Sequence, residues 1–320
     1  TGALDFAGTG NALANSLVGG AGNDTLDGGL GNDTLIGGAG DDTYAINALT
    51  DVIVENPGAG SDTVVVGIAS GTYLLGAHLE NALAGGSGAV NITGNALDNV
   101  IEGNSGNNSL VGGDGNDTLD GLGGVDTVDG GLGTDTLTGG LGDDSYRVFN
   151  SGAIIVEGAG QGTNDKVHAA VNFSLAADDD IELMTTISAA GVAAINLRGN
   201  ALAQRIIGNA GNNTLDDGGA GGNDTLEGGA GADRFDASAG NDLITDAEMA
   251  AGDLIFLGRG YTGWAQIAAR INHQAINGPT VNDVVIRHAD GTQTVLLAMR
   301  GALGAAAFLF SGAADRVEGT

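Results

Sequence analysis

Apolar residues recur every nine positions in three blocks of the chain, residues 10–45, 93–147 and 199–245. In the clearest units, such as 19–27 (GGAGNDTLD) and 112–120 (GGDGNDTLD), six residues rich in Gly, Asn and Asp precede three whose central residue is apolar. Glycine tolerates the positive φ values that tight turns need, and a short run around an apolar residue favours a strand. Each unit therefore predicts a tight turn followed by a very short strand.

The eighth position of the unit is apolar throughout the three blocks. The residues are Leu17, Leu26, Leu35, Tyr44, Val100, Leu110, Leu119, Val128, Leu137, Tyr146, Ile206, Leu215, Leu226, Phe235 and Ile244. If the strands stack, two units form one coil of eighteen residues, and these side chains point into a narrow common core. The pattern predicts an all-β parallel solenoid.

Two spacers, residues 46–92 and 148–198, separate the blocks and resemble each other in sequence. Both contain short β-branched runs bounded by Gly, Asn and Asp, a pattern that favours strands and turns. We expect the spacers to continue the solenoid, with Val54, Val65 and Ile155 facing inward. No helical periodicity is evident in residues 1–245.

The nine-residue pattern stops near Asp246, and residues 246–320 are expected to form a separate C-terminal element. Residues 261–272 (YTGWAQIAARIN) are predicted to form an amphipathic helix. Residues 282–299 are predicted to form a β-hairpin whose turn contains Asp290 and Gly291. The solenoid domain is accordingly placed at 1–245.

Composition narrows the class of protein further. The 320 residues carry a formal charge of -30, which argues against nucleic acid or an anionic membrane as a partner. Cysteine is absent, which excludes a disulfide scaffold, and an apolar fraction of 42% is too high for an acidic disordered tail. No apolar run is long enough to span a membrane, and the N-terminal residues show no cleavable secretory signal. Either the sequence starts inside a longer protein or export uses another route.

The sixth position carries the candidate chemistry, because it is acidic in most units: Asp24, Asp33, Asp42, Asp98, Asp117, Asp126, Asp135, Asp144, Asp224, Asp233 and Asp242. In a stacked solenoid these carboxylates would form ladders with neighbours ~5 Å apart, where two unit charges repel by ~3 kcal/mol at an effective dielectric of 20. A hard divalent cation between the loops would remove this repulsion, and calcium suits irregular oxygen ligation better than magnesium. Simple turn formation by the aspartates is the weaker alternative. Ninth-position aspartates such as Asp129 are interpreted as solvated surface charges.

The unit G-G-x-G-x-D-x-U-x, in which U is apolar, resembles the RTX calcium-binding repeat. The resemblance implies a right-handed parallel β-roll with several calcium ions between stacked loops, bound by the sixth-position aspartates and by turn carbonyls. It also implies type I secretion from a Gram-negative bacterium, guided by an uncleaved C-terminal signal, with folding outside the cell. The glycines expected to contribute to the metal sites are Gly20, Gly22, Gly29, Gly31, Gly38, Gly40, Gly113, Gly115, Gly131, Gly133, Gly140, Gly142, Gly229 and Gly231.

Loops two units apart are expected to share a cation. Sites with two carboxylates are predicted at Asp24/Asp42, Asp117/Asp135, Asp126/Asp144 and Asp224/Asp242, with Asp98/Asp117 as a further candidate. An amide replaces one carboxylate in Asn15/Asp33, Asn108/Asp126, Gln204/Asp224 and Asn213/Asp233, which should bind more weakly or stay empty. These units stand at the start of each block, where a capping loop is expected.

Three classes of function fit these observations. We expect a non-enzymatic, calcium-binding structural or cell-surface protein of the S-layer or adhesin type, with self-assembly or cell-surface polysaccharide as its partner interactions. The alternatives are the secretion and folding module of a larger lipase or protease, and a calcium-responsive binding module. Catalysis is not expected of this chain, since its histidines, His78, His168, His273 and His288, are scattered and no hydrolase motif occurs.

Overall fold

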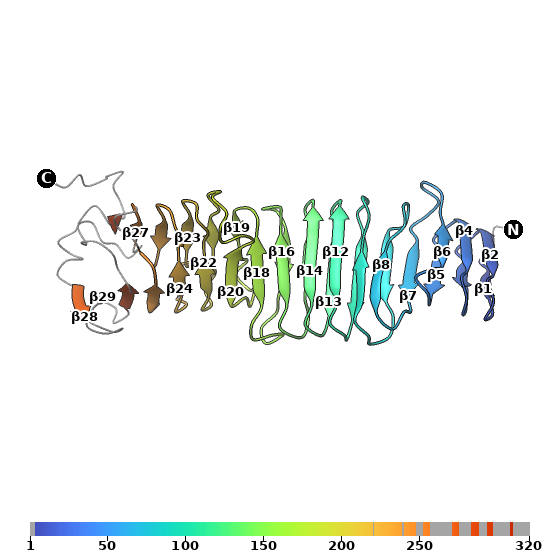
Figure 1. The fold of residues 1–320 in the computed structure, drawn as a ribbon, viewed down its shortest axis with the longest axis horizontal. Helices are drawn as coiled ribbons and strands as arrows, with labels where there is room; N and C mark the ends of the chain where they lie inside the picture. The colour runs from blue at the N-terminus through green and yellow to red at the C-terminus, as the bar shows by residue number, and fades with distance from the viewer. Residues whose placement is uncertain are drawn as a thin grey trace. The chain divides into compact units, whose positions relative to one another are not determined.

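The computed structural model of the chain describes residues 4–219, 221–238, 240–247 and 252–256, and the strands at 271–274, 283–287, 293–296 and 308–309. Every regular element in these residues is a β-strand. None of them forms a helix long and apolar enough to cross a membrane. The chain divides into two compact units, Thr1–Thr163 and Asn164–Thr320, each of which stacks its strands coil upon coil as a parallel β-solenoid (Figure 1).

One face of the first unit is a nine-stranded parallel sheet. Its strands follow one another as β1 (Ala7–Thr9), β3 (Thr25–Asp27), β5 (Thr43–Ile46), β7 (Thr63–Val66), β9 (Asn81–Ala84), β11 (Val100–Asn104), β13 (Thr118–Leu122), β15 (Thr136–Thr138) and β17 (Ile154–Val156). Strands of the other face form two groups: β2 (Ser16–Ala21), β4 (Thr34–Ala39) and β6 (Val52–Val54), then β8 (Gly71–Leu74), β10 (Val90–Thr93), β12 (Ser109–Asp114), β14 (Thr127–Leu132) and β16 (Ser145–Val148). Alternate strands along the chain thus belong to opposite faces.

The second unit repeats this alternation. One face contains β18 (Lys166–Ala169), β20 (Leu183–Thr186), β22 (Arg205–Ile207), β24 (Thr225–Glu227) and β26 (Asp242–Ile244), and continues into β30 (Gln293–Leu296), β29 (Asp283–Arg287) and β28 (Ile271–Gln274). The other contains β19 (Phe173–Ser174), β21 (Leu197–Arg198), β23 (Thr214–Asp216), β25 (Arg234–Asp236), β27 (Leu254–Phe256) and β31 (Phe308–Leu309). Only β28, β29 and β30 pair antiparallel among the described strands of this unit.

Strand pairing gives the length of each coil. Leu119 pairs with Leu137, so the coils of the second block contain eighteen residues, as the period predicts. Tyr44 pairs with Val64, twenty residues later, because the turn between these strands is longer. The strands stay in register while insertions are absorbed by the turns. The right-handed sense of the coil stays a prediction.

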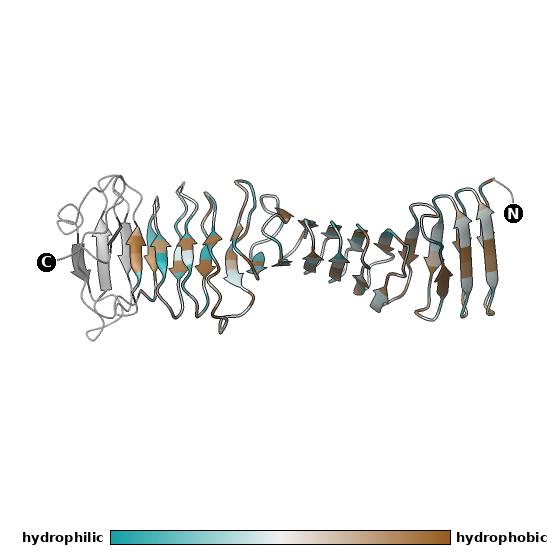
Figure 2. Cartoon of the chain, turned by 90° about the horizontal axis from the view of Figure 1, so that it is seen from above, coloured by the Kyte–Doolittle hydropathy of each residue, from teal (hydrophilic) through white to brown (hydrophobic). Residues whose placement is uncertain are grey.

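The core is a narrow column of eighth-position side chains, as predicted. Apart from Leu17 and Val100, all the eighth-position residues named above are fully buried. In Figure 2 the hydrophobic bands cross the strands, and hydrophilic colour marks many of the turns. Each coil contributes only a few apolar residues, so stability depends on contact between neighbouring coils.

The spacer strands are present, but two of the predicted inward residues are wrong. Ile155 on β17 is buried, whereas Val54 on β6 is 42% exposed. Val65 lies between the buried residues Val64 and Val66 and faces outward. Side chains alternate along a strand, so an error of one residue inverts the prediction for the whole strand. Pairing of Val64 with Tyr44 shows which residue of β7 continues the core.

The C-terminal predictions have mixed outcomes. Antiparallel pairing of β29 with β30 confirms the hairpin strands, while its turn at Asp290 and Gly291 falls outside the described residues. Most of the helix predicted at 261–272 also lies outside them. Its last two residues begin strand β28, which pairs with β29, so the helix is wrong at that end. Pairing across a sheet edge prevails there over a weak helical pattern.

Candidate metal centre

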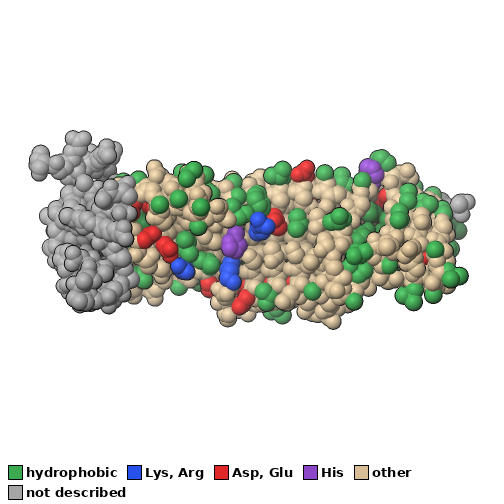
Figure 3. Space-filling view, in the orientation of Figure 1, with side chains coloured by type: hydrophobic (Ala, Val, Ile, Leu, Met, Phe, Trp, Pro, Cys, Tyr) green, Lys and Arg blue, Asp and Glu red, His purple; other side chains and the backbone are tan. Residues whose placement is uncertain are grey.

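Sixth-position aspartates are buried inside the turns of both units. With the exception of Asp98, none is more than 2% exposed: Asp24, Asp33, Asp42, Asp117, Asp126, Asp135, Asp144, Asp224, Asp233 and Asp242. Figure 3 accordingly shows few acidic side chains on the face it draws, although the chain contains 40 Asp and Glu. Buried carboxylates require compensation by hydrogen bonds or cations.

The assignment of Asp98 to the sixth position is wrong by one residue. Asp98 is exposed, whereas Asn99 is buried and donates its backbone N–H to Asp117 Oδ1 at 2.7 Å. Ile101 is likewise the core residue in place of Val100, which is 48% exposed. This unit lacks most of the glycines that fix the register elsewhere.

Hydrogen bonds join the sixth positions of successive coils into a ladder. In each rung, one Oδ1 accepts the backbone N–H of the residue one coil earlier, as Asp42 does from Asp24 at 2.7 Å. The predicted stacked pairs form such rungs: Asp24/Asp42, Asp117/Asp135, Asp126/Asp144, Asp224/Asp242, Asn15/Asp33, Asn108/Asp126, Gln204/Asp224 and Asn213/Asp233. Asn99 replaces Asp98 in the rung with Asp117.

The ladder extends into the first spacer, which the sequence analysis did not anticipate. Asp51 Oδ1 accepts from Asp33, Asp62 Oδ1 from Asp42, and Glu80 Oε2 from Asp62. A signal for Asp62 exists in the sequence, since Asp62, Thr63 and Val64 repeat the aspartate, threonine and apolar residue of the nine-residue unit.

The second carboxylate oxygen of seven of these aspartates meets no donor among the described residues. Within the described chain, no hydrogen-bond partner reaches the buried Oδ2 atoms of Asp24, Asp33, Asp42, Asp117, Asp126, Asp224 and Asp233. Six of them lie against the glycine at the first position of their own unit, whereas Asp224 Oδ2 lies against Gly222, two residues before it. A Cβ on Gly112 would collide with Asp117 Oδ2, and one on Gly121 with Asp126 Oδ2. Glycine at these positions leaves the space around the oxygen open.

Burial raises the pKa of the ladder carboxylates. The pKa of Asp126 is about 7 because burial outweighs the N–H bond from Asn108, and the charge of Asp144 adds to the effect. Burial likewise raises the pKa of Asp224 to about 7 and those of Asp117 and Asp233 to about 6. These sites therefore favour either a proton or a cation.

Amides at the block edges have a structural role of their own. Asn108 Nδ2 donates to the carbonyl oxygen of Val90 at 2.7 Å, and Asn213 Nδ2 donates to that of Ile195 at 2.8 Å. Asn99 Nδ2 donates to the carbonyl oxygens of Leu79 and Glu80. An amide replaces the aspartate where the preceding coil offers carbonyl oxygens, because only the amide can donate to them.

Fifth-position side chains form a second ladder, in which each side chain accepts from the next coil rather than from the preceding one. Asn116 Oδ1 accepts the N–H of Thr134, one coil later, at 2.9 Å, and Asn23 Oδ1 accepts that of Asp41 at 3.0 Å. The dipeptide at positions five and six therefore holds a loop to both neighbouring coils. Sequence analysis did not separate this role from turn formation.

Ninth-position aspartates cap the turns and are not simply solvated charges. Asp27 Oδ1 accepts the N–H of Gly29 at 2.9 Å, and Asp129 Oδ1 accepts that of Gly131 at 3.1 Å. Asp129 is only 9% exposed and also lies 3.5 Å from Arg147. The solvated interpretation is thus wrong for Asp129, whose carboxylate stabilises the start of the next loop.

The predicted turn glycines adopt the backbone conformation that the loops require. Positive φ values occur at Gly20, Gly22, Gly29, Gly31, Gly38, Gly40, Gly113, Gly115, Gly131, Gly133, Gly140, Gly142, Gly229 and Gly231. Leu122 has a φ of 68° at a position where units such as 19–27 and 112–120 have glycine. Metal ligation through the carbonyl groups of these glycines stays a prediction.

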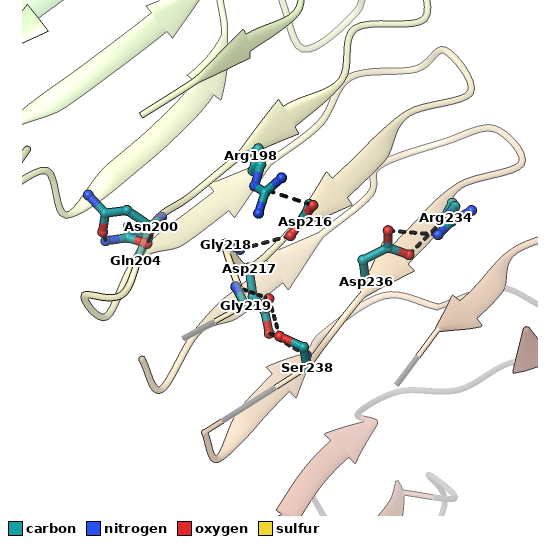
Figure 4. A network of polar contacts seen from close by, with 10 residues as sticks. All are labelled: Arg198, Asn200, Gln204, Asp216, Asp217, Gly218, Gly219, Arg234, Asp236 and Ser238. Atoms are coloured by element: carbon teal, nitrogen blue, oxygen red, sulfur yellow. Dashed lines mark hydrogen bonds and ion pairs between the residues drawn. The ribbon is translucent and has the colours of Figure 1, made fainter. Parts of the chain in front are cut away.

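In the second unit, arginines neutralise part of the acidic surface (Figure 4). Arg234 Nε lies 2.6 Å from Asp236 Oδ1, and Arg198 Nε lies 3.6 Å from Asp216 Oδ2. Asp217 instead points toward Ser238, whose hydroxyl donates to it at 2.9 Å. Asp217 belongs to a buried group with Asp224 and Asp242, in which one carboxylate oxygen of each lies within 4.8 Å of the others.

The donor set fits calcium. All the side-chain ligands that the ladders offer are oxygens, no cysteine occurs, and the open Oδ2 atoms are buried and anionic. Hard cations with flexible coordination prefer such oxygens, and calcium accepts six to eight of them. Bound there, calcium would neutralise the stacked carboxylates while Oδ1 keeps its hydrogen bond to the previous coil.

Comparison with known proteins agrees with this arrangement. The chain matches the family described as RTX calcium-binding nonapeptide repeat (4 copies) at residues 9–44, 80–110, 93–128, 111–146, 198–221 and 218–245. No curated protein matches the chain. Among solved structures it is similar to the extracellular lipase LipA from Serratia marcescens, with 18% sequence identity and a TM-score of 0.29. That match covers 79% of this chain and 45% of the lipase, so the chain spans less than half of that protein's length.

Proposed function

We propose that the chain, which belongs to the RTX calcium-binding repeat family over its matched regions, is an extracellular structural protein whose solenoid folds when calcium fills the aspartate ladders. Proteins with these repeats are typically secreted by type I systems. One observation carries the proposal. Buried Oδ2 atoms of aspartates such as Asp24 and Asp42 stand in register from coil to coil, and no donor in the described residues reaches them. Such an array is unfavourable without a cation and favourable with one.

The proposed product is the solenoid itself, of the S-layer or adhesin type. Coils fill the described chain from β1 to β27, so most of its length presents repeated surface. Several β-branched side chains on the outer faces of strands remain exposed, among them Val52, Val54, Ile154 and Val156. Exposed apolar surface supports contact with another copy or with a cell-surface polymer. The proposal assigns no catalytic role to the solenoid.

A calcium titration of the complete chain tests the proposal. In metal-free buffer at pH 8 we expect an expanded chain, and millimolar calcium should produce the circular dichroism of β-structure cooperatively. Light scattering in the same titration separates the two types of surface protein, because an S-layer subunit assembles whereas an adhesin stays monomeric. A β signal of full amplitude in metal-free buffer at pH 8, insensitive to added calcium, would refute the proposed coupling.

A further inference from the structure

We propose that Asp42, Glu55 and Asp62 form an additional calcium site in the spacer that follows the first block. One carboxylate oxygen of each residue lies within 4.8 Å of the others. Glu55 and Asp62 lie beyond the repeat match, which ends at residue 44. The site goes beyond the proposed function because its ligands are not those of the nine-residue unit.

Strand pairing explains how these residues meet. Ile36 on β4 pairs with Val54 on β6, so Glu55 follows one coil after Gly37. A glutamate therefore stands where the repeat has its first glycine. Asp62 is stacked on Asp42, whose backbone N–H donates to Asp62 Oδ1 at 2.8 Å.

Two buried oxygen atoms of the cluster have no hydrogen-bond partner among the described residues. Asp42 and Asp62 are each 1% exposed, and their Oδ1 atoms accept the N–H groups of the preceding rungs. Their Oδ2 atoms have no hydrogen-bond partner in the described chain. A Cβ on Gly37 would collide with both Asp42 Oδ2 and the hydroxyl of Tyr44, so these two groups lie together over Gly37.

Tyr44 joins the glutamate to this arrangement. Its hydroxyl donates to Glu55 Oε1, which leaves the other oxygen, Oε2, accepting only the N–H of Asn56 at 3.1 Å. The same residue types recur at the end of the second block, where the hydroxyl of Tyr146 donates to Glu157 Oε2. The tyrosine at the end of a block thus holds the glutamate beside the last ladder aspartate.

No Lys or Arg among the described residues forms an ion pair with this cluster. Arg147 is the first Lys or Arg in the sequence, and none of the ion pairs in the described residues involves the three acidic groups. Two buried carboxylates and the half-buried one of Glu55, with oxygens within 4.8 Å of one another, repel strongly, and a divalent cation removes most of that charge. The ligands are all oxygens of irregular arrangement, which favours calcium over magnesium.

Terbium luminescence tests the site, since this hard ion binds oxygen ligands and is excited through a nearby phenol ring. The experiment uses the complete chain with Tyr146→Phe at pH 7.5, so that Tyr44 is the tyrosine beside a clustered glutamate. We expect emission on excitation of tyrosine, displaced by calcium and lost in Tyr44→Phe. Glu55→Gln should weaken terbium binding at the emitting site at least tenfold. Glu102→Gln, an exposed glutamate on β11, serves as the matched control and should change nothing.

Circular dichroism in calcium checks that each variant folds. If Glu55→Gln does not fold, Asp62→Asn replaces it, because its amide oxygen can still accept the N–H of Asp42. Emission and affinity unchanged in the folded variant, or emission that survives Tyr44→Phe, would overturn the proposal. Failure of the unsubstituted chain to fold on calcium addition would instead refute the function proposed above.

Discussion

Asp42 accepts the backbone N–H of Asp24 through Oδ1 at 2.7 Å and directs Oδ2 to no donor in the described chain. An asparagine could make the first contact, so the hydrogen bond alone does not explain the preference for aspartate. The bond joins residues eighteen positions apart and is not a local turn contact. Turn formation is the role of the ninth position instead, where Asp27 bonds Gly29. A bound cation would therefore explain the charge at the sixth position.

Removal of one ladder charge should weaken calcium-dependent folding. Asp126→Asn keeps an oxygen for the N–H of Asn108 but loses the anionic Oδ2. We expect its calcium midpoint, measured by circular dichroism, to rise about tenfold, equivalent to ~1.4 kcal/mol. Asp129→Asn keeps the bond to Gly131 and should scarcely shift the midpoint. Equal shifts in the two variants would contradict the assignment of the ladder.

Protons should partly replace calcium. The folded pKa values of Asp126 and Asp224 are about 7, above the ordinary value of 3.8, so the folded chain binds protons more tightly than the unfolded chain. This stabilising contribution is complete below pH ~4 and is lost as the pH rises through about 7. In metal-free buffer, circular dichroism should therefore show more β-structure at pH 5 than at pH 8, where the chain is expected to be expanded. The opposite order would argue against buried ladder carboxylates.

Open space beside the aspartate Oδ2 should be as important for stability and calcium binding as the charge of the carboxylate. Gly130→Ala places a Cβ against Asp135 Oδ2 without a demand for positive φ, and the crowding should cost ~1–3 kcal/mol. Calorimetry should also show weaker calcium binding. Gly123→Ala is the matched control, because its Cβ would meet only the ordinary van der Waals contact of Leu141 at 3.6 Å. A similar loss in both variants would point to general loop disruption.

An added carboxylate at a block edge should destabilise the fold. Asn108→Asp loses the donor to the Val90 carbonyl and places a second buried charge beside Asp126, at a cost of ~2–4 kcal/mol at pH 8 in the lowest calcium concentration that folds the unsubstituted chain. Asn107→Asp is the control, since Asn107 is exposed and its role as acceptor for Val125 is preserved. Thermal unfolding of both variants, at that calcium concentration and in excess calcium, measures the difference. A stability gain in Asn108→Asp at the lower calcium concentration would contradict the donor role of the amide.

Periodicity in the sequence was sufficient to predict the solenoid, the eighteen-residue coil and the burial of the eighth position. The prediction of the sixth position failed in the unit where most of the glycines are missing. Gly94 and Gly103 continue the nine-residue spacing of Gly112 and Gly121, and counting from Gly94 identifies Asn99 as the sixth residue. The preference for an acidic residue alone assigned Asp98 to the sixth position. Without the glycine spacing, nothing distinguishes Asp98 from the neighbouring Asn99 as the sixth residue.

Ladder residues in the spacer could not be found from the nine-residue period. A turn with two extra residues places Asp62 twenty positions after Asp42, so the repeat frame misses it. Glu55 joins the same cluster through pairing of β6 with β4, a contact between coils that no local pattern encodes. The polarity of the fifth- and sixth-position bonds likewise emerges only once the coils are stacked.

The side chains at positions five and six form hydrogen bonds in opposite directions along the stack. The stack should therefore gain and lose order at its two ends. An interior loop is held from both sides, as Asn23 accepts the N–H of Asp41 in the next coil while Asp24 accepts that of Phe6 in the preceding coil, whereas a terminal loop has one neighbour only. Loss of order should therefore begin as fraying at the outermost coil and advance inward one coil at a time. Growth should follow the same route in reverse, with each finished coil acting as the template on which the next is laid down.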